Sequence, residues 1–182
     1  MKTFRLLLPL LCCIIALSGC RALRTPVVVK NEPTEAYKYA YITPTKELTS
    51  SAGGTYGNAY GVYGSTVTKS VNPSDIISGE LIKAGFIVIP ELKPELSDKT
   101  VIVSYGETGK HNRGFGYTIE VTIQFISAES HEMVWTCTAE GQGSTEADDI
   151  RQAIRRALSA LFYGTDGLEI ETTEYEIYPG TD

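Results

Sequence analysis

The most regular alternation of apolar and polar positions lies between Gly116 and Gly141. Apolar residues occupy every second position from 117 to 125, and the alternation resumes from 133 to 139 after a polar turn at 127–132. A period of two is that of an extended strand with one apolar and one polar face. Two such runs joined by a short polar segment predict a β-hairpin, whose apolar face other elements must cover because a hairpin alone is marginal in water.

Other segments have the apolar content of strands: 37–42, 86–89 and 100–105. Segment 86–89 has four apolar residues in succession, as expected of a strand that is central or buried on both faces. A loop is expected at 106–114, before the hairpin. The short apolar run 27–29 would add an edge strand.

Two helices are expected to cover the sheet. The first begins at the capping residue Asn72 and ends at Gly85. The second follows a cap at Ser144 or Thr145, and its apolar residues recur every three or four positions as far as Leu161. Three arginines are expected on its solvent side: Arg151, Arg155 and Arg156.

The order of these elements predicts one α+β domain, residues 36–165, in which a mostly antiparallel sheet carries two helices packed on one face. Residues 50–70 are rich in glycine and tyrosine, and we expect a mobile loop or loose hairpin, because so much glycine carries a high ordering entropy and buries little. The acidic segment 166–182 is expected as a tail or a further edge strand.

The first 19 residues have the pattern of a secretory signal, with a basic start and an apolar run at 6–17 that is too short to span a bilayer. Residues 17–20, Leu-Ser-Gly-Cys, resemble the lipobox of bacterial lipoprotein precursors. This resemblance implies that the signal is cut before Cys20 and that both the Cys20 thiol and the new amino terminus are acylated. More than one acyl chain gives stable anchoring. Residues 20–35 would then form a lipidated tether; a plain secretory signal is the alternative.

The residues after Cys20 bear on localisation. Arg21 follows it, and no Asp stands there as a retention signal. Resemblance to lipoproteins of bacteria with two membranes therefore implies delivery to the outer membrane, and the periplasmic face is the expected one. The net charge of −6 argues against binding nucleic acid or anionic head groups. The lipid on Cys20 is thus the expected membrane contact.

The four cysteines leave no disulfide to expect. Cys12 and Cys13 belong to the signal, and Cys20 is assigned to the lipid. Cys137 remains, on the apolar side of its strand, and we expect a buried structural thiol.

Neither a metal site nor a cofactor is expected. The chain has two histidines, His111 and His131, in different loops, whereas a metal site needs ligands that converge. Solvated loop residues are the simpler interpretation of these, of Glu107 and of Arg113. Segment 106–110 lacks the spacing of a phosphate-binding loop.

Acidic residues near the second helix offer a different chemistry. They are Glu140, Glu146, Asp148 and Asp149. A carboxylate pair among them, or Glu107, would suit glycan cleavage. Nothing in their spacing requires it, and stabilisation of the first helical turn accounts for most of them. No catalytic residue is therefore assigned.

Three tyrosines on a glycine-rich backbone make residues 50–70 a candidate contact surface. Tyr56, Tyr60 and Tyr63 would stack on sugars or donate hydrogen bonds to a partner. A neutral surface excursion is the alternative.

A strand, a turn, Val134-Trp135 and a closing helix resemble the signature of a family of small uncharacterised bacterial lipoproteins. The matching residues are Leu81, Gly85, Phe86, Ile119, Val121, Ile123, Ser127, Val134 and Trp135. The resemblance covers residues 37–162 and leaves 50–70 unaligned. The layout is also similar to that of outer-membrane lipoproteins that assist lipopolysaccharide assembly or activate peptidoglycan synthases, which implies an accessory role in the cell envelope.

The expected function is therefore that of a lipid-anchored, non-catalytic periplasmic module that binds an envelope protein or a glycan. Two alternatives stay open. One is an envelope hydrolase with paired carboxylates, and the other is a structural surface lipoprotein that assembles through sheet edges.

Overall fold

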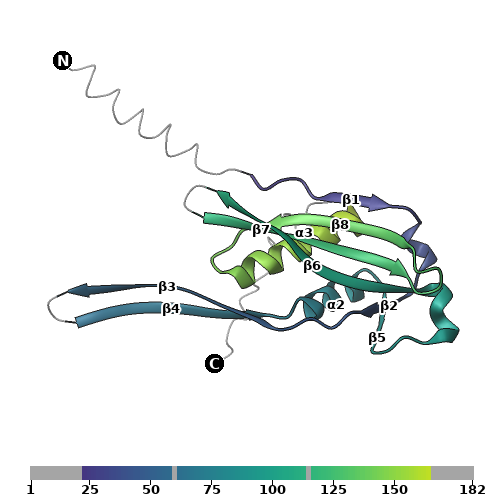
Figure 1. Cartoon of the computed structure of the whole chain (residues 1–182), viewed down its shortest axis with the longest axis horizontal. Coiled ribbons are helices and arrows are strands. Elements are labelled where there is room, and N and C mark those ends of the chain that lie inside the picture. The colour runs from purple at the N-terminus through teal and green to yellow at the C-terminus, as the bar shows by residue number, and fades with distance from the viewer. Residues whose placement is uncertain (1–21, 59–60, 114–115, 165–182) are drawn as a thin grey trace, which may run out of the picture.

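The computed structural model describes residues 22–58, 61–113 and 116–164. Its main sheet has the order β1-β8-β7-β6-β2-β5 (Figure 1). The strands are β1 (Val27–Lys30), β2 (Tyr39–Ile42), β5 (Ile87–Ile89), β6 (Thr100–Arg113), β7 (Gly116–Ser127) and β8 (Met133–Gly141). β1, β8, β7 and β6 pair antiparallel in turn, whereas β2 runs parallel to both β6 and β5. With its two α-helices, this sheet confirms the predicted α+β class.

The β7–β8 hairpin is the centre of the fold, as its alternation predicts. Ile123 pairs with Cys137 and Phe125 with Trp135, and all four side chains are fully buried. The register shifts after Phe125, so that Val134 is buried and Met133 is 44% exposed. The expected place of Met133 on the apolar face is wrong because this irregularity interrupts the period of two.

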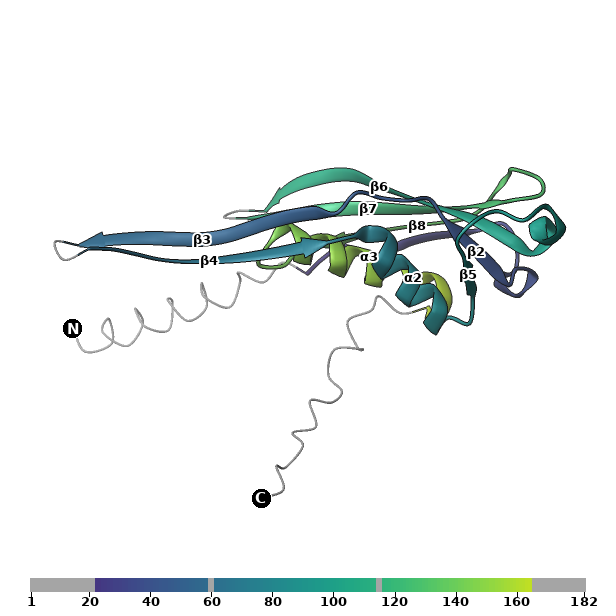
Figure 2. The ribbon, with the colours of Figure 1, turned by 90° about the horizontal axis from the view of Figure 1, so that it is seen from below.

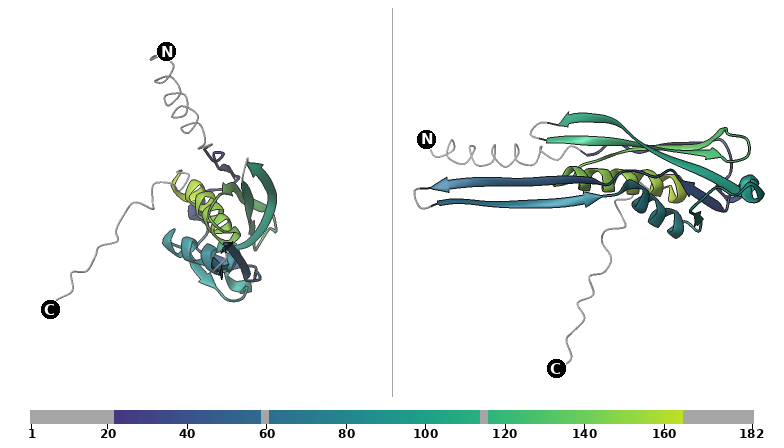
Figure 3. Two further views of the ribbon diagram at one scale, coloured as in Figure 1. Left: turned by 90° about the vertical axis from the view of Figure 1, so that its left-hand side faces the viewer. Right: turned by 60° about the horizontal axis from the view of Figure 1, so that its bottom comes forward.

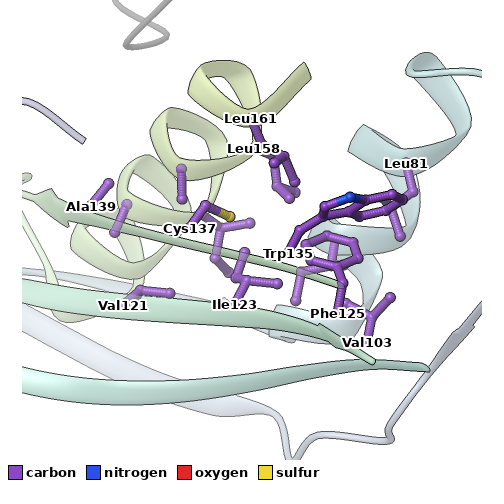
Figure 4. Close-up of a cluster of buried hydrophobic side chains, with 14 of the residues drawn as sticks. Leu81, Val103, Val121, Ile123, Phe125, Trp135, Cys137, Ala139, Leu158 and Leu161 are labelled. Carbon is purple, nitrogen blue, oxygen red and sulfur yellow. The ribbon is translucent and has the colours of Figure 1, made fainter. Parts of the chain in front are cut away.

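Both α-helices lie on one face of the sheet (Figure 2). α2 (Pro73–Lys83) packs on β2 and β5, and α3 (Glu146–Tyr163) packs on β7 and β8. The inward side chains of β7 and β8 meet α3 in a continuous apolar core, with Leu81 of α2 beside Trp135 (Figure 4). No helix in the described ranges is long and apolar enough to cross a membrane.

Aromatic rings close the core at one end, around Trp135. The rings in contact with it belong to Tyr37, Phe86, Phe125 and Phe162, at centroid distances of 5.2–6.5 Å. The Trp135 indole N–H donates to the Glu32 carbonyl at 2.8 Å, so its one polar atom is satisfied. Glu32 leads into a short 3₁₀ turn, η1 (Thr34–Ala36), and a second turn, η2 (Pro94–Lys99), precedes β6.

Three further local predictions are wrong. β5 is the terminal strand of the sheet and not a central one, and Ile87 on it is 46% exposed. The expected loop at 106–114 continues β6 as far as Arg113, because its backbone pairs with β7 through a register shift between Glu107 and Gly109. Arg156 is 1% exposed and does not lie on the solvent side of α3.

The segment expected as a mobile loop or loose hairpin forms a regular antiparallel hairpin. β3 (Leu48–Asn58) and β4 (Gly61–Val71) make a separate two-stranded sheet, with Tyr56 opposite Tyr63. The hairpin projects past the main sheet (Figures 1 and 3). The threonines and tyrosines of both strands and the valines of β4 favour extended backbone, which outweighs the effect of the glycines.

The expected tether is docked over much of its length. Within residues 20–35, Val27–Lys30 forms β1 at the edge of the sheet beside β8. This confirms the predicted edge strand at 27–29. Cys20, Tyr60 and the tail 166–182 lie outside the described residues.

Candidate functional site at the base of the hairpin

The hairpin β3–β4 is fastened to the first turn of α3. Lys69 Nζ lies 2.8 Å and 3.0 Å from the two carboxylate oxygens of Asp148. Arg151 donates to Asp148 at 3.2 Å and to the Ser70 carbonyl at 3.3 Å. The Lys69–Asp148 ion pair and the hydrogen bond from Arg151 to the Ser70 carbonyl therefore tie β4 to α3.

β3 is held by the same helix end. The backbone N–H of Ala147 donates to Ser50 Oγ at 2.9 Å. Ala147 lies in the first turn, whose N–H groups lack partners within the helix. Thr145 caps the neighbouring Asp148 N–H at 3.3 Å, which confirms one of the two predicted caps. The sequence at 144–148 thus both starts the helix and provides the fastening for the hairpin.

Several hydrogen bonds hold the Asp148 carboxylate in its charged form. Burial would raise its pKa, but hydrogen bonds from Lys69, Ser144 and Thr145 outweigh burial and lower the pKa to about 2. The carboxylate is ionised at every physiological pH. Asp148 is therefore a fixed anion at the base of the hairpin.

The base of the hairpin also joins the hydrophobic core. Val71, the last residue of β4, is 2% exposed and packs among the core residues. From there each strand extends for 11 residues, a length of about 36 Å. One end of the hairpin is therefore rigidly seated in the domain.

The first described residues are fixed at the same end of the main sheet. Arg24 Nε lies 3.4 Å from Glu140 Oε1, and the Arg24 N–H donates to Glu140 Oε2 at 3.3 Å. The buried Arg156 donates to the Glu140 carbonyl at 2.6 Å and to the Arg24 carbonyl at 2.9 Å. Glu140 is at the end of β8, a few residues before the helix that holds the hairpin. Chain entry and hairpin base therefore share one end of the domain.

Against expectation, His111 lies close to Glu120 and Glu140 at this end of the sheet. His111, Glu120 and Glu140 place ligand atoms within 4.8 Å of one another, a donor set of the kind that holds a divalent cation. Arg24 contacts both carboxylates, at 3.4 Å and 4.0 Å, so a protein cation already offsets part of their negative charge. The assignment of His111 to a loop hid this convergence, which requires β6 to extend to Arg113.

Of the remaining candidate residues, Glu107 and Glu146 line one depression of about 290 Å³ together with Lys110, and the others lie apart from it. Glu107 accepts a hydrogen bond from Tyr105 at 3.0 Å, and His131 lies in the β7–β8 turn with a φ of 62°. Glu146 lies 3.9 Å from Lys110. Arg113 ends β6, and its side chain is outside the described part of the structure.

Asp149 bonds to the loop that precedes α3. It accepts a hydrogen bond from the Gly143 N–H, and burial raises its pKa, an effect that this hydrogen bond opposes. Asp148 and Asp149 are thus neighbours with opposite pKa shifts. Their contacts close the loop before α3 and fasten β4, which are structural tasks.

A shallow depression of about 320 Å³ lies beside the fastening. It is lined by Gln142, Gly143, Ser144, Asp148, Arg151, Gln152 and Arg155. Of the tyrosines expected to bind a partner, Tyr56 and Tyr63 are opposite each other on the hairpin. They lie toward its far end and not at this depression.

Comparison with known proteins gives a distant likeness only. No model of a known protein family matches the chain, and no curated protein matches it. Among solved structures, it is similar to the PelC dodecamer from Paraburkholderia phytofirmans in space group P6, with 13% identity, a TM-score of 0.42 and coverage of 76% of this chain and 96% of that one. A point variant of that dodecamer, in space group C2, is also 13% identical, with a TM-score of 0.42 and coverage of 76% of this chain and 97% of that one.

Proposed function

We propose that this protein is a lipid-anchored, non-catalytic accessory module of the bacterial cell envelope, and that the β3–β4 hairpin is its working surface. The observation that carries the proposal is the hairpin itself. It has 11 residues in each strand, it projects past the domain, and Lys69, Ser70 and Ser50 fasten its base to α3 (Figure 3). The six-stranded sheet and its helices act as the platform that holds it.

The lipid anchor rests on the lipobox-like segment that ends at Cys20. Three residues separate Cys20 from Arg24, and the four chain steps between these two residues span at most about 14 Å. Because Arg24 is bonded to Glu140 and Arg156, an acylated Cys20 would keep this end of the domain close to the bilayer. We place the module at the outer membrane, facing the periplasm.

The hairpin offers two kinds of contact to an envelope protein or a glycan. Each outer edge carries backbone N–H and C=O groups that a partner strand would pair with. The tyrosines of the segment supply rings and hydroxyl groups suited to a protein surface or to sugars. Assembly through these edges is the second candidate function, because β3 and β4 pair with no further strand in the described structure.

The hydrolase alternative is less well supported. Asp148 bonds to Lys69, Ser144 and Arg151, and Asp149 bonds to Gly143. These contacts explain both carboxylates as structural groups, and we propose no reaction for them.

Crosslinking in intact cells followed by affinity capture tests the proposal. The unmodified chain should recover a reproducible partner, and a variant in which a short Gly-Ser turn replaces residues 51–67 should lose it. Ile87→Thr is the matched control, since Ile87 is an exposed residue of the terminal strand β5. Capture that is the same with and without residues 51–67 would refute the role of the hairpin.

The anchor is tested separately. Mass spectrometry of the unmodified chain should show acyl groups on Cys20, and a Cys20→Ser chain that has lost residues 1–19 should leave the membrane fraction for the soluble periplasmic fraction. An unmodified Cys20 thiol would refute the anchor, as would a Cys20→Ser chain without residues 1–19 that stays in the membrane fraction.

A further inference from the structure

Neither outer edge of the β3–β4 hairpin pairs with a further strand within the described structure. An 11-residue strand presents several N–H and C=O groups along each edge. A two-stranded ribbon is marginally stable in water, and a long unpaired edge is a template for another strand. The hairpin therefore has the form of a partly built sheet.

The sequence of the hairpin lacks the features that block edge pairing. Residues 48–71 contain no proline, and Lys69 is their one charged residue. Lys69 lies at the base and is bound to Asp148, so the rest of both edges is uncharged. Soluble proteins usually protect such edges with charge, proline or short strands.

The main sheet follows the usual rule at both of its edges. β1 has four residues and ends in Lys30, while β5 has three and is followed by Pro90. Features that block edge pairing are thus present at both edges of the main sheet and are missing along the hairpin. This contrast indicates that the edges of the hairpin pair with strands of another chain.

The proposed anchor decides how two copies can meet, and this step rests on the proposed function. Arg24 and the base of the hairpin lie at one end of the domain. Copies anchored in one bilayer are related by rotation about the membrane normal. Their hairpins then point the same way relative to the membrane.

Strand direction within co-oriented hairpins fixes the pairing. β3 runs from the base to the far end, and β4 runs back (Figure 1). When two such hairpins stand side by side, β4 of one copy meets β3 of the next in antiparallel orientation. Pairing β3 with β3 would instead be parallel, which gives a slightly less stable ladder.

We infer that the partner of the hairpin is a second copy of this chain, bound by antiparallel pairing of β4 in one copy with β3 in the next. Each copy offers one edge of each kind, so the interface is heterologous. Repetition of such an interface about one axis gives a closed ring in which every hairpin edge is paired.

The first test is the mass of the full chain in detergent, measured by light scattering after gel filtration. The unmodified chain should have a mass several times that of one copy, and the variant with residues 51–67 replaced should be a monomer. Ile87→Thr should keep the mass of the unmodified chain. A monomeric unmodified chain would overturn the inference.

The second test identifies the strands that pair and leaves the hairpin in place. One chain carries Thr49→Cys on β3, and a second carries Thr68→Cys or Ser70→Cys on β4. Separate expression followed by oxidation should give no disulfide-linked dimer, whereas co-expression of a β3 and a β4 variant should give one. Equivalent strands of neighbouring copies would be about 9.6 Å apart, twice the strand spacing and beyond the reach of a disulfide.

The outcomes separate this inference from the proposed function. Dimers from Thr49→Cys alone, with none from co-expression, would overturn the β4–β3 arrangement. A monomeric chain whose hairpin still captures a different envelope protein would overturn self-association and leave the proposed function intact. Capture that is independent of residues 51–67 would overturn the proposed function itself.

Discussion

Lys69 of β4 and Asp148 of α3 are 79 positions apart and form a salt bridge with an Nζ–Oδ2 distance of 2.8 Å. This contact joins a projecting hairpin to the helix that covers the centre of the sheet. The Asp148 carboxylate also accepts hydrogen bonds from Ser144, Thr145 and Arg151. One side chain thereby links the helix start, the preceding loop and the hairpin.

Acid should weaken this fastening in a defined pH range. The pKa of Asp148 falls from 3.8 to about 2 on folding. Its contribution to stability is therefore complete above about pH 4 and is lost as the pH falls toward 2. Lys69→Met should cost about 1 kcal/mol in the free energy of unfolding at pH 7, because both side chains are partly exposed.

Urea denaturation at pH 7 and at pH 2–3 measures this effect. The difference between the unmodified chain and Lys69→Met should shrink at the lower pH. Lys83→Met is the control, since Lys83 makes an exposed pair with Glu80 on α2 and should change stability by less than about 0.5 kcal/mol. A pH-independent effect of Lys69→Met would contradict the assignment.

Arg156 and Arg155 are adjacent on α3 and should differ sharply when replaced. Arg156→Met removes a buried hydrogen bond to the Glu140 carbonyl and a partly buried one to the Arg24 carbonyl, and should cost about 2–4 kcal/mol. Arg155→Met removes an exposed guanidinium that lies 3.6 Å from Glu80, and should cost less than about 1 kcal/mol. Urea denaturation midpoints of the two variants measure this difference. Equal losses of stability would show that Arg156 does not hold this end of the sheet.

Gly141 allows β8 to approach α3 closely. A Cβ added there would lie 1.8 Å from the Asp149 carbonyl oxygen, so Gly141→Ala should cost about 3 kcal/mol or more. Gly79 lies within α2 and has no atom within 4 Å of an added Cβ. Gly79→Ala should therefore leave stability unchanged or raise it by about 0.5–1 kcal/mol. Thermal unfolding of the two variants checks this contrast, which a tolerated Gly141→Ala would contradict.

Cys137 should resist thiol reagents while the chain is folded. Its side chain is fully buried, and burial raises its pKa to about 12. With Cys20 acylated, the mature chain should release no chromophore from Ellman's reagent in the native state and one equivalent in denaturant. Rapid native labelling would show that Cys137 is exposed or that Cys20 carries a free thiol.

Local periodicity and helix caps predict much of the platform. The alternation at 117–125 places Val121, Ile123 and Phe125 on the buried face, and the cap at Thr145 marks the start of α3. Such signals depend on backbone geometry within a few residues. They also identify Cys137 as a core residue and 27–29 as a strand.

The fastening of the hairpin could not be predicted in the same way. Lys69 and Asp148 are ordinary surface residues by sequence, and their pairing depends on the path of the chain between them. Arg156 follows Arg155 in the sequence. Helical spacing alone does not reveal that Arg156 is buried and donates to the carbonyl groups of Glu140 and Arg24. His111 meets Glu120 and Glu140 because β6 continues beyond its apolar core.

The sequence by itself determined the elements of this protein: the central hairpin, the two helices, the α+β class and the buried thiol. The side-chain cap expected at Asn72 is wrong, because Thr45 Oγ1 accepts the Ser74 N–H in its place and itself donates to Asn72. Only the tertiary structure decided that β5 ends the sheet, that Arg156 is inside and that the glycine-rich segment is a hairpin fastened to α3. The physical reason is range. Strand period and helix caps are set by neighbouring residues, whereas strand order, burial of a charge and pairing of distant side chains depend on where the whole chain passes.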